Sequence, residues 1–195
     1  MKRKVLRSLQ IVSLLVVLVT AFYSFKWKSS ARPDIDVIKN SIGDRVVEVT
    51  MEKSNGVDVN KLGDTDYLML VYSTQLIDMG DYMAELFGHV TVKNNGGSEE
   101  DYNNAVVDLN SKYECYKDVP EKYNIFCKYI DLDSVNPIDL EDNTLVSGAT
   151  EDVTNGMNEL IKVDKIAFAN TLALLVVFIA TLIDWSFTNK KNNKN

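Results

Sequence analysis

Two segments without a charged residue lie near the two ends of the chain, and they constrain its fold more than any other feature. They run from Leu9 to Phe25 and from Ile166 to Ile183. A helix of about 17 to 25 mostly apolar residues crosses the hydrocarbon core of a bilayer. The sequence therefore predicts transmembrane helices at residues 9–25 and 166–185, with a domain at residues 26–165 between them.

Each segment has a second interpretation. The first has the form of a cleaved signal peptide, because the basic stretch 1–7 precedes it. Lys26, Trp27 and Lys28 follow it directly and are typical of an interfacial anchor, which favours an uncleaved helix. The second could be a buried core helix, but it has no broad polar face and a basic tail follows it. Two spans are the preferred prediction, and cleavage of the first stays open.

The distribution of Lys and Arg predicts the orientation of the chain in the membrane. Tail 1–8 carries four basic residues and no acid, and tail 186–195 carries Lys190, Lys191 and Lys194. Basic tails prefer the cytoplasm, and an even number of spans puts both tails on one side. Domain 26–165 is then extracytoplasmic or lumenal. The short spans and the absence of an Asn-x-Ser/Thr sequon do not decide between the endoplasmic reticulum and a bacterial inner membrane.

Residues 26–165 are strongly acidic, with 14 Lys and Arg against 27 Asp and Glu. This charge argues against nucleic acid as a partner and favours a basic protein surface or a cation. Stretch 131–142 is rich in oxygen ligands, but it lacks the glycine and the final glutamate of an EF-hand loop. We expect a solvated acidic loop, with cation binding left open. Its polar residues are Asp131, Asp133, Asn136, Asp139, Glu141 and Asp142.

Cys115 and Cys127 are the only cysteines. In an oxidising compartment their spacing suits one disulfide, whereas a redox-active pair would need a much closer spacing. His89 is the sole histidine, so a zinc cluster of the Cys/His type is excluded. No motif marks a nucleophile or an acid–base pair. We therefore predict no catalytic, cofactor-binding or metal-binding residue, no cofactor, and a protein that is not an enzyme.

The pattern inside the domain predicts a small α/β sandwich between the two spans. Alternating or continuous apolar residues predict strands at 45–51, 66–73 and 123–132, with a short one at 89–92. Helices are predicted at 34–43 and 75–87, stopped by Gly43 and Gly88. A third helix opens at the cap Ser98, and a fourth begins at Thr150 and continues into the second span.

Polar and small residues within the second span indicate contacts between membrane helices. Hydrocarbon offers a polar side chain no other partner, so Asn170, Thr171, Ala173 and Thr181 are predicted to lie in helix packing interfaces.

The preferred hypothesis is a non-enzymatic two-pass membrane protein that serves as an accessory or assembly subunit of a larger membrane complex. Its domain would bind a protein partner, and its spans would contact the lipid bilayer and other membrane proteins. The alternative is a self-assembling two-span scaffold or pore, a homo-oligomer. A third hypothesis is a membrane-tethered hydrolase or redox relic.

Overall fold

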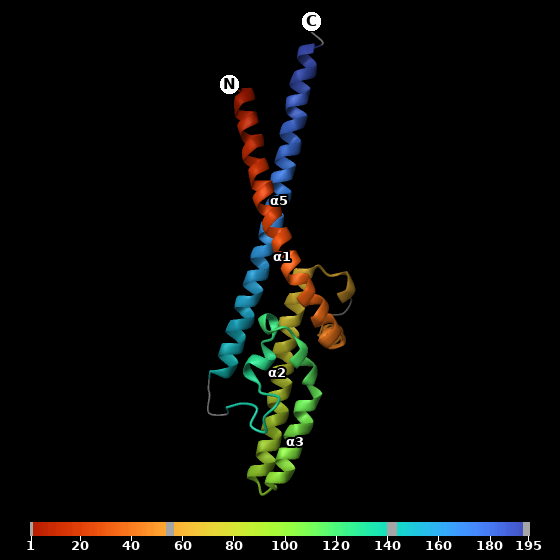
Figure 1. Cartoon of the computed structure of the whole chain (residues 1–195), viewed down its shortest axis with the longest axis vertical. Helices are drawn as coiled ribbons and strands as arrows, with labels where there is room; N and C mark the ends of the chain where they lie inside the picture. Colours follow the sequence, from red (N-terminus) through yellow and green to blue (C-terminus); the bar gives the residue numbers. More distant parts are fainter. Residues whose placement is uncertain (1, 54–56, 140–143, 193–195) are drawn as a thin grey trace. The chain divides into compact units, whose positions relative to one another are not determined.

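The computed structural model describes residues 2–53, 57–139 and 144–192, and the side chains of 2, 3, 53 and 187–192 are not described within them. In these ranges the chain forms helices and no strand, so the predicted α/β sandwich is wrong. The elements, shown in Figure 1, are α1 (Lys2–Lys53), η1 (Val59–Lys61), α2 (Asp64–Asn94), α3 (Glu99–Lys112), η2 (Glu114–Asp118), η3 (Glu121–Tyr123), α4 (Phe126–Tyr129) and α5 (Leu145–Asn192).

Two of the predicted strands lie in long helices. Residues 45–51 belong to α1, where Val46, Val49 and Thr50 are buried at a spacing that places them on one helix face. Residues 66–73 belong to α2, where Leu68, Val71 and Tyr72 repeat this spacing. The alternating β-branched residues of 45–51 and the continuous apolar centre of 66–73 suggested strands, but the burial of both stretches has helical periodicity. Continuation of an amphipathic helix outweighs a weak local preference.

The other two predicted strands are also absent. Residues 89–92 form the last part of α2, and residues 123–132 contain the end of η3, the short helix α4 and extended backbone that pairs with no strand among the described residues.

The predicted helix ends have a mixed outcome. Gly43 and Gly88 lie inside α1 and α2 and stop neither, and α5 begins at Leu145, before Thr150. The cap at Ser98 is confirmed, because its hydroxyl oxygen accepts a hydrogen bond from the backbone N–H of Asp101. The helix predicted to continue into the second apolar segment is also confirmed, since α5 is unbroken.

The chain divides into two compact units, which are described separately. The span unit comprises residues 1–30 and 161–195, and the helical domain comprises residues 31–160.

In the helical domain, α2 packs against α3 and α4. It forms a helical hairpin with α3, closed by Gly96 at φ 103°, a value that favours glycine (Figure 1). Buried residues of α3 line the hairpin, namely Tyr102, Val106 and Leu109. The part of α1 within this domain buries a periodic apolar stripe made of Ala31, Ile35, Ile38, Ile42, Val46 and Val49.

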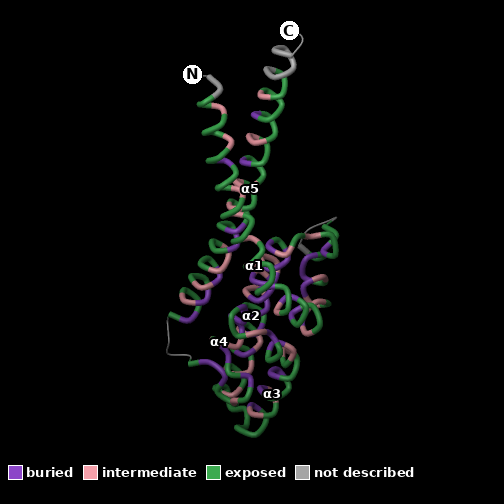
Figure 2. The backbone as a smooth tube through the Cα atoms, turned by 45° about the horizontal axis from the view of Figure 1, so that its top comes forward, coloured by how far each residue is buried: buried purple, intermediate pink, exposed green. Residues whose placement is uncertain are grey.

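The span unit contains parts of two helices that are long and apolar enough to cross a membrane. Figure 2 shows most of both helices as exposed in this unit. Large apolar side chains such as Phe22, Phe25 and Phe168 are on the surface. This composition and exposure fit a membrane protein.

Candidate functional site: a buried polar stripe on α2 and a polar seam between the spans

A stripe of polar side chains lies in the core of the helical domain. Gln75, Asp78 and Tyr82 are fully buried on α2 at spacings of three and four residues, which place them on one face of the helix. Each makes hydrogen bonds to residues far away in the sequence. Because a buried polar group is costly unless it is paired, this stripe fixes which segments pack on α2.

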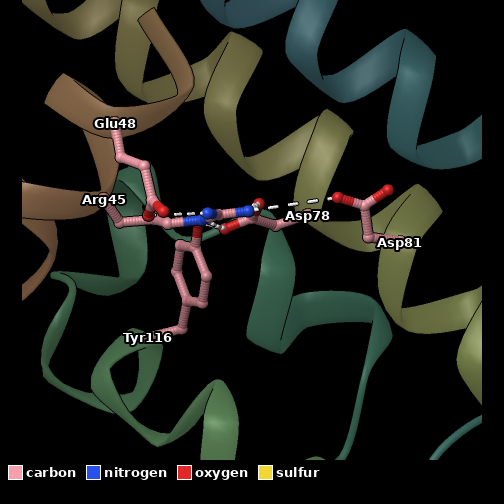
Figure 3. Close-up of polar contacts among 5 residues, drawn as sticks. All are labelled: Arg45, Glu48, Asp78, Asp81 and Tyr116. Atoms are coloured by element: carbon pink, nitrogen blue, oxygen red, sulfur yellow. Dashed lines mark hydrogen bonds and ion pairs between the residues drawn. The ribbon is translucent and has the colours of Figure 1, made fainter. Parts of the chain in front are cut away.

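Asp78 is the centre of a buried clasp (Figure 3). Arg45 from α1 donates to both carboxylate oxygens, with distances of 3.0 Å from Nε to Oδ2 and 2.6 Å from Nη2 to Oδ1. Tyr116 from η2 donates its hydroxyl hydrogen to Oδ2 at 2.7 Å. At the outer side, Glu48 accepts from Arg45 Nη1 at 2.8 Å, and Asp81 lies 3.9 Å from Nη2. The clasp therefore joins α1, α2 and η2.

The surroundings of the clasp keep the protons on Arg45 and Tyr116, because the pKa of each group is raised. The hydrogen bond to Asp78 is the main cause that raises the pKa of Arg45, and burial is the main cause that raises the pKa of Tyr116, with the charge of Asp78 adding to it. The Asp78 side chain is 1% exposed and that of Arg45 is 30% exposed. A carboxylate that is enclosed and occupied by these donors is suited to hold elements together rather than to transfer protons to a substrate.

Gln75 holds the chain that leads into α4. Its Nε2 donates to the carbonyl of Tyr123 at 2.8 Å, and its Oε1 accepts from the backbone N–H groups of Ile125 and Phe126 at 2.8 Å and 3.0 Å. These backbone groups lie at the start of a short helix, where no intrahelical partner exists. One amide side chain thus satisfies backbone groups that a strand partner would otherwise have to meet.

Asparagines complete the polar framework. Asn110 accepts from the Tyr82 hydroxyl at 2.6 Å and donates to the carbonyl of Ser134 at 2.9 Å. Asn124 donates to the carbonyl of Tyr116 at 2.7 Å. An aromatic cluster fills the space beside these bonds, with the rings of Tyr116 and Phe126 stacked at 4.3 Å. Segment 113–134 is therefore bound to α2 and α3 mainly through side chains.

The first turns of α5 contact α4 and α2 through tyrosine rings. Tyr129 donates its hydroxyl hydrogen to Asp152 at 2.6 Å, and Lys128 also pairs with this carboxylate. The hydrogen bond from Lys128 is the main cause that lowers the pKa of Asp152. Gly148 lies against the Tyr129 ring and Gly156 against the Tyr72 ring. Two glycines and one aspartate at four-residue steps thus form one face of α5 that accepts these rings.

The two predicted disulfide residues lie in neighbouring segments. Cys115 is in η2 and Cys127 in α4, both are half-buried free thiols, and their sequence neighbours Tyr116 and Phe126 stack on each other. Burial raises the pKa of both thiols, and Cys115 adds to the rise at Cys127. Both thiols are free in this structure, so the disulfide stays a prediction.

A polar seam runs between α1 and α5 in the span unit. The Thr20 hydroxyl lies 3.0 Å from Asn170 Oδ1 and 2.7 Å from the carbonyl oxygen of Val16 in its own helix, so these acceptors share its one hydrogen. Gln10 Nε2 donates to Thr181 Oγ1 at 3.4 Å. Among its described side chains, the buried residues of the unit are Ser13 on α1 and Val163, Ala173 and Ala180 on α5. On both helices the less exposed positions recur at alternating three- and four-residue steps. This spacing is typical of helices that pack at a small angle.

The four residues singled out in the second span have different surroundings. Asn170 and Thr181 are in the hydrogen bonds of the seam, and Ala173 is buried in it. Thr171 is exposed and donates to the carbonyl of Ala167 in its own helix. The structure thus brings three of the four together on the side of α5 that contacts α1.

The acidic stretch 131–142 is described only as far as Asp139, so Glu141 and Asp142 lie outside the described residues. Asp133 pairs with Lys117 at 2.6 Å, and the backbone N–H of Asp131 donates to the carbonyl of Pro137. Over the described side chains, no three carboxylate, histidine or cysteine groups are placed to hold a metal ion. His89 lies 3.9 Å from Glu85 on α2.

No local pattern in the sequence marks Asp78 and Arg45 as partners. They are far apart along the chain, and each lies in a stretch where the apolar residues form the main pattern. The spacing of Gln75, Asp78 and Tyr82 does indicate their role, because three polar residues between Val71 and Leu86 interrupt an otherwise apolar face of the helix.

Comparison of the chain with protein-family models, with curated proteins and with solved structures gave no match.

Proposed function

We propose that this chain is a non-enzymatic two-pass membrane protein that serves as an accessory or assembly subunit of a larger membrane complex. Both basic tails lie in the cytoplasm, and the helical domain lies on the other side and binds a protein partner. The observation that supports this most is the polar seam, in which small and polar side chains of the spans face each other and large apolar ones face outward.

The distribution of side chains in the span unit is the one that hydrocarbon favours. In lipid, a polar side chain is stabilised by a partner inside the protein, as Thr20 and Asn170 are by each other. In water, a surface with Phe22, Phe25 and Phe168 exposed would lead to aggregation. A bilayer around this unit accounts for both the inner and the outer surface.

The polar core of the helical domain supports a role other than catalysis. Its most elaborate polar group, the clasp at Asp78, is enclosed, and its donors and acceptors bind one another. A catalytic group must be accessible to substrate, and it must have a donor or acceptor atom that is free to bond to it. The clasp has the properties of a structural element that makes the domain a rigid binding module.

The surface charge of the helical domain indicates the kind of partner. Residues 31–160 contain 10 Lys and Arg against 26 Asp and Glu, and many carboxylates are exposed on α3, including Glu100 and Asp108. Such a surface attracts a partner with a basic face and repels nucleic acid. Because Gln10, Thr20, Asn170 and Thr181 of the spans form hydrogen bonds within the chain, we assign the recognition of the partner to the helical domain.

The test is affinity purification of the intact protein from its native membrane in mild detergent, followed by mass spectrometry and a native mass. A stoichiometric set of other membrane proteins, released as the salt concentration rises, is the expected result. A paired variant, Glu100→Lys with Asp108→Lys, should lose partners, whereas Asn103→Gln with Asn104→Gln on the same helix should keep them. A large species that contains this chain alone would contradict the proposal and favour the scaffold or pore.

A second test addresses topology. Single cysteines placed at residues 4 and 100 of a chain without its native cysteines should differ in labelling by a membrane-impermeant maleimide. Position 100 should react from outside the cell or from the lumen, and position 4 only after the membrane is opened. Equal labelling of both positions in sealed membranes would refute the two-pass arrangement.

A further inference from the structure

Two hydrogen bonds set the register of α1 against α5 in the span unit. Gln10 bonds to Thr181 and Thr20 bonds to Asn170, so the residue numbers rise along α1 while those of their partners fall along α5. The two helices are therefore antiparallel, and residues at equal distances from the Thr20–Asn170 pair lie at the same level.

This register brings four lysines to one level. Lys26 and Lys28 follow Thr20 by six and eight residues, and Lys165 and Lys162 precede Asn170 by five and eight. All four side chains are exposed. We call this group the lysine collar. Asp164 is the single acid in residues 21–30 and 161–170, so the collar keeps a net positive charge.

The collar lies at the boundary of the apolar surface. Between Arg7 and Lys26, and again between Lys165 and Asp184, the chain carries no charge. Each stretch has 18 residues, which rise about 27 Å as a helix and nearly match a hydrocarbon core of about 30 Å. Lysines at such a boundary extend their ammonium groups to the phosphate level of the bilayer.

The surface next to Lys165 has the shape and chemistry for a lipid. A shallow hollow of about 290 Å³ is lined by Ile161, Phe168, Asp164 and Lys165 of α5. Its accessible surface is mostly apolar, and the charged residues Asp164 and Lys165 also line it. A glycerophospholipid has complementary groups, because its phosphate can pair with the ammonium group of Lys165 and its acyl chains can contact the apolar surface.

We propose that the lysine collar binds the phosphate groups of anionic phospholipids in the leaflet next to the helical domain. This inference rests on the proposed two-pass topology. The ammonium groups make charge-assisted hydrogen bonds to phosphate oxygens, while Phe25 and Phe168 contact the first acyl carbons. A zwitterionic lipid has a phosphate as well, but its own cation competes with the lysines for it.

The experiment uses the full chain in nanodiscs with equal amounts of phosphatidylglycerol and phosphatidylcholine. Native mass spectrometry then identifies the lipids that stay bound when the nanodisc is removed. The wild type should retain phosphatidylglycerol with a several-fold preference. The variant Lys26→Gln, Lys28→Gln, Lys162→Gln, Lys165→Gln should show no preference, and an equal loss of charge in the helical domain, at Lys61, Lys93, Lys112 and Lys122, should leave the preference intact.

The possible outcomes separate this inference from the proposed function. The lipid inference fails alone if the chain spans the nanodisc but the wild type shows no preference for phosphatidylglycerol. It also fails alone if the control variant loses as much of this preference as the collar variant. Loss of bound phosphatidylglycerol on addition of inorganic phosphate would also overturn it, because the collar would then be a site for soluble phosphate. If the maleimide test shows that the chain does not cross the bilayer, the proposed topology and the lipid inference fail together.

Discussion

A Cβ atom on Gly156 would lie 2.6 Å from Cζ of Tyr72, so the tyrosine ring of α2 occupies the space that any other residue on α5 would need. This distance is far below a normal van der Waals contact. The same face of α5 receives Tyr129 at Gly148. The absence of a side chain at two positions is thus what allows α5 to approach its neighbours in the helical domain.

Gly156→Ala should destabilise the helical domain by about 1 to 3 kcal/mol, because overpacking outweighs the better helix propensity of alanine. Near-UV circular dichroism of the full chain in detergent, followed through urea unfolding, measures the change. Gly88→Ala on α2 is the matched control, since open space surrounds Gly88, and it should stabilise by up to about 1 kcal/mol. Equal effects of the two substitutions would show that the Tyr72 contact has no energetic weight.

Asp78→Ala should cost about 3 to 5 kcal/mol, because it leaves Arg45 without its main partner and removes the acceptor of Tyr116. Glu48→Gln at the outer side of the clasp should change the free energy of unfolding by less than about 1 kcal/mol, since exposed ion pairs contribute little. Equilibrium unfolding of both variants gives the comparison. The double variant Asp78→Leu with Arg45→Met should be more stable than Asp78→Ala alone, and the opposite order would contradict a buried charge pair.

The pairing of Asp152 with Lys128 and Tyr129 predicts that the stability of the fold depends on pH in the acidic range. The pKa of Asp152 is lowered in the folded chain, so the carboxylate stabilises the fold above the ordinary pKa of an aspartate, near 3.8. The contribution is lost as the pH falls through the folded pKa. The difference in unfolding free energy between the wild type and Asp152→Asn should therefore shrink between pH 5 and strong acid. A constant difference over that range would rule out this pairing in solution.

The raised pKa values of Cys115 and Cys127 predict slow thiol chemistry. In the reduced full chain, iodoacetamide should react slowly at neutral pH and faster as the pH rises above the usual thiol value, because only the thiolate attacks. Protein isolated from an oxidising compartment with a thiol oxidant should show a Cys115–Cys127 disulfide by mass mapping. Two free thiols in such a preparation would contradict the predicted bond.

The sequence identified the long apolar helices and the start of α3, because these features depend on local signals: charge-free length, a cap and helical periodicity. It misassigned residues 45–51 because their alternating β-branched residues are typical of a strand, and residues 66–73 because a short continuous apolar run is typical of a buried strand. In α1 and α2 the same residues are at helical spacing against a common core. Periodicity judged over the whole of α2, from Leu68 through Val71 and Gln75, would have indicated a helix.

The clasp and the seam could not be predicted from the sequence for another reason. The Arg45–Asp78 pair joins residues 33 positions apart, and the Thr20–Asn170 pair joins residues 150 positions apart. Such pairs depend on the arrangement of helices, which a single sequence does not encode in any local pattern. The sequence indicated that Asn170 would find a partner in the membrane; only the structure shows that the partner is Thr20 of the same chain.

The role of Gln75 has a consequence for aggregation. Residues 123–132 are rich in β-branched and aromatic side chains, and they would pair readily with another strand. In the native domain their first backbone groups are occupied by the amide of Gln75, a side chain that takes the place of a neighbouring strand. Gln75→Leu would keep the core apolar yet leave these groups free, so we expect it to convert a soluble domain into one that forms thioflavin-positive aggregates. On this prediction, one buried amide protects the domain against misassembly in addition to its charged surface.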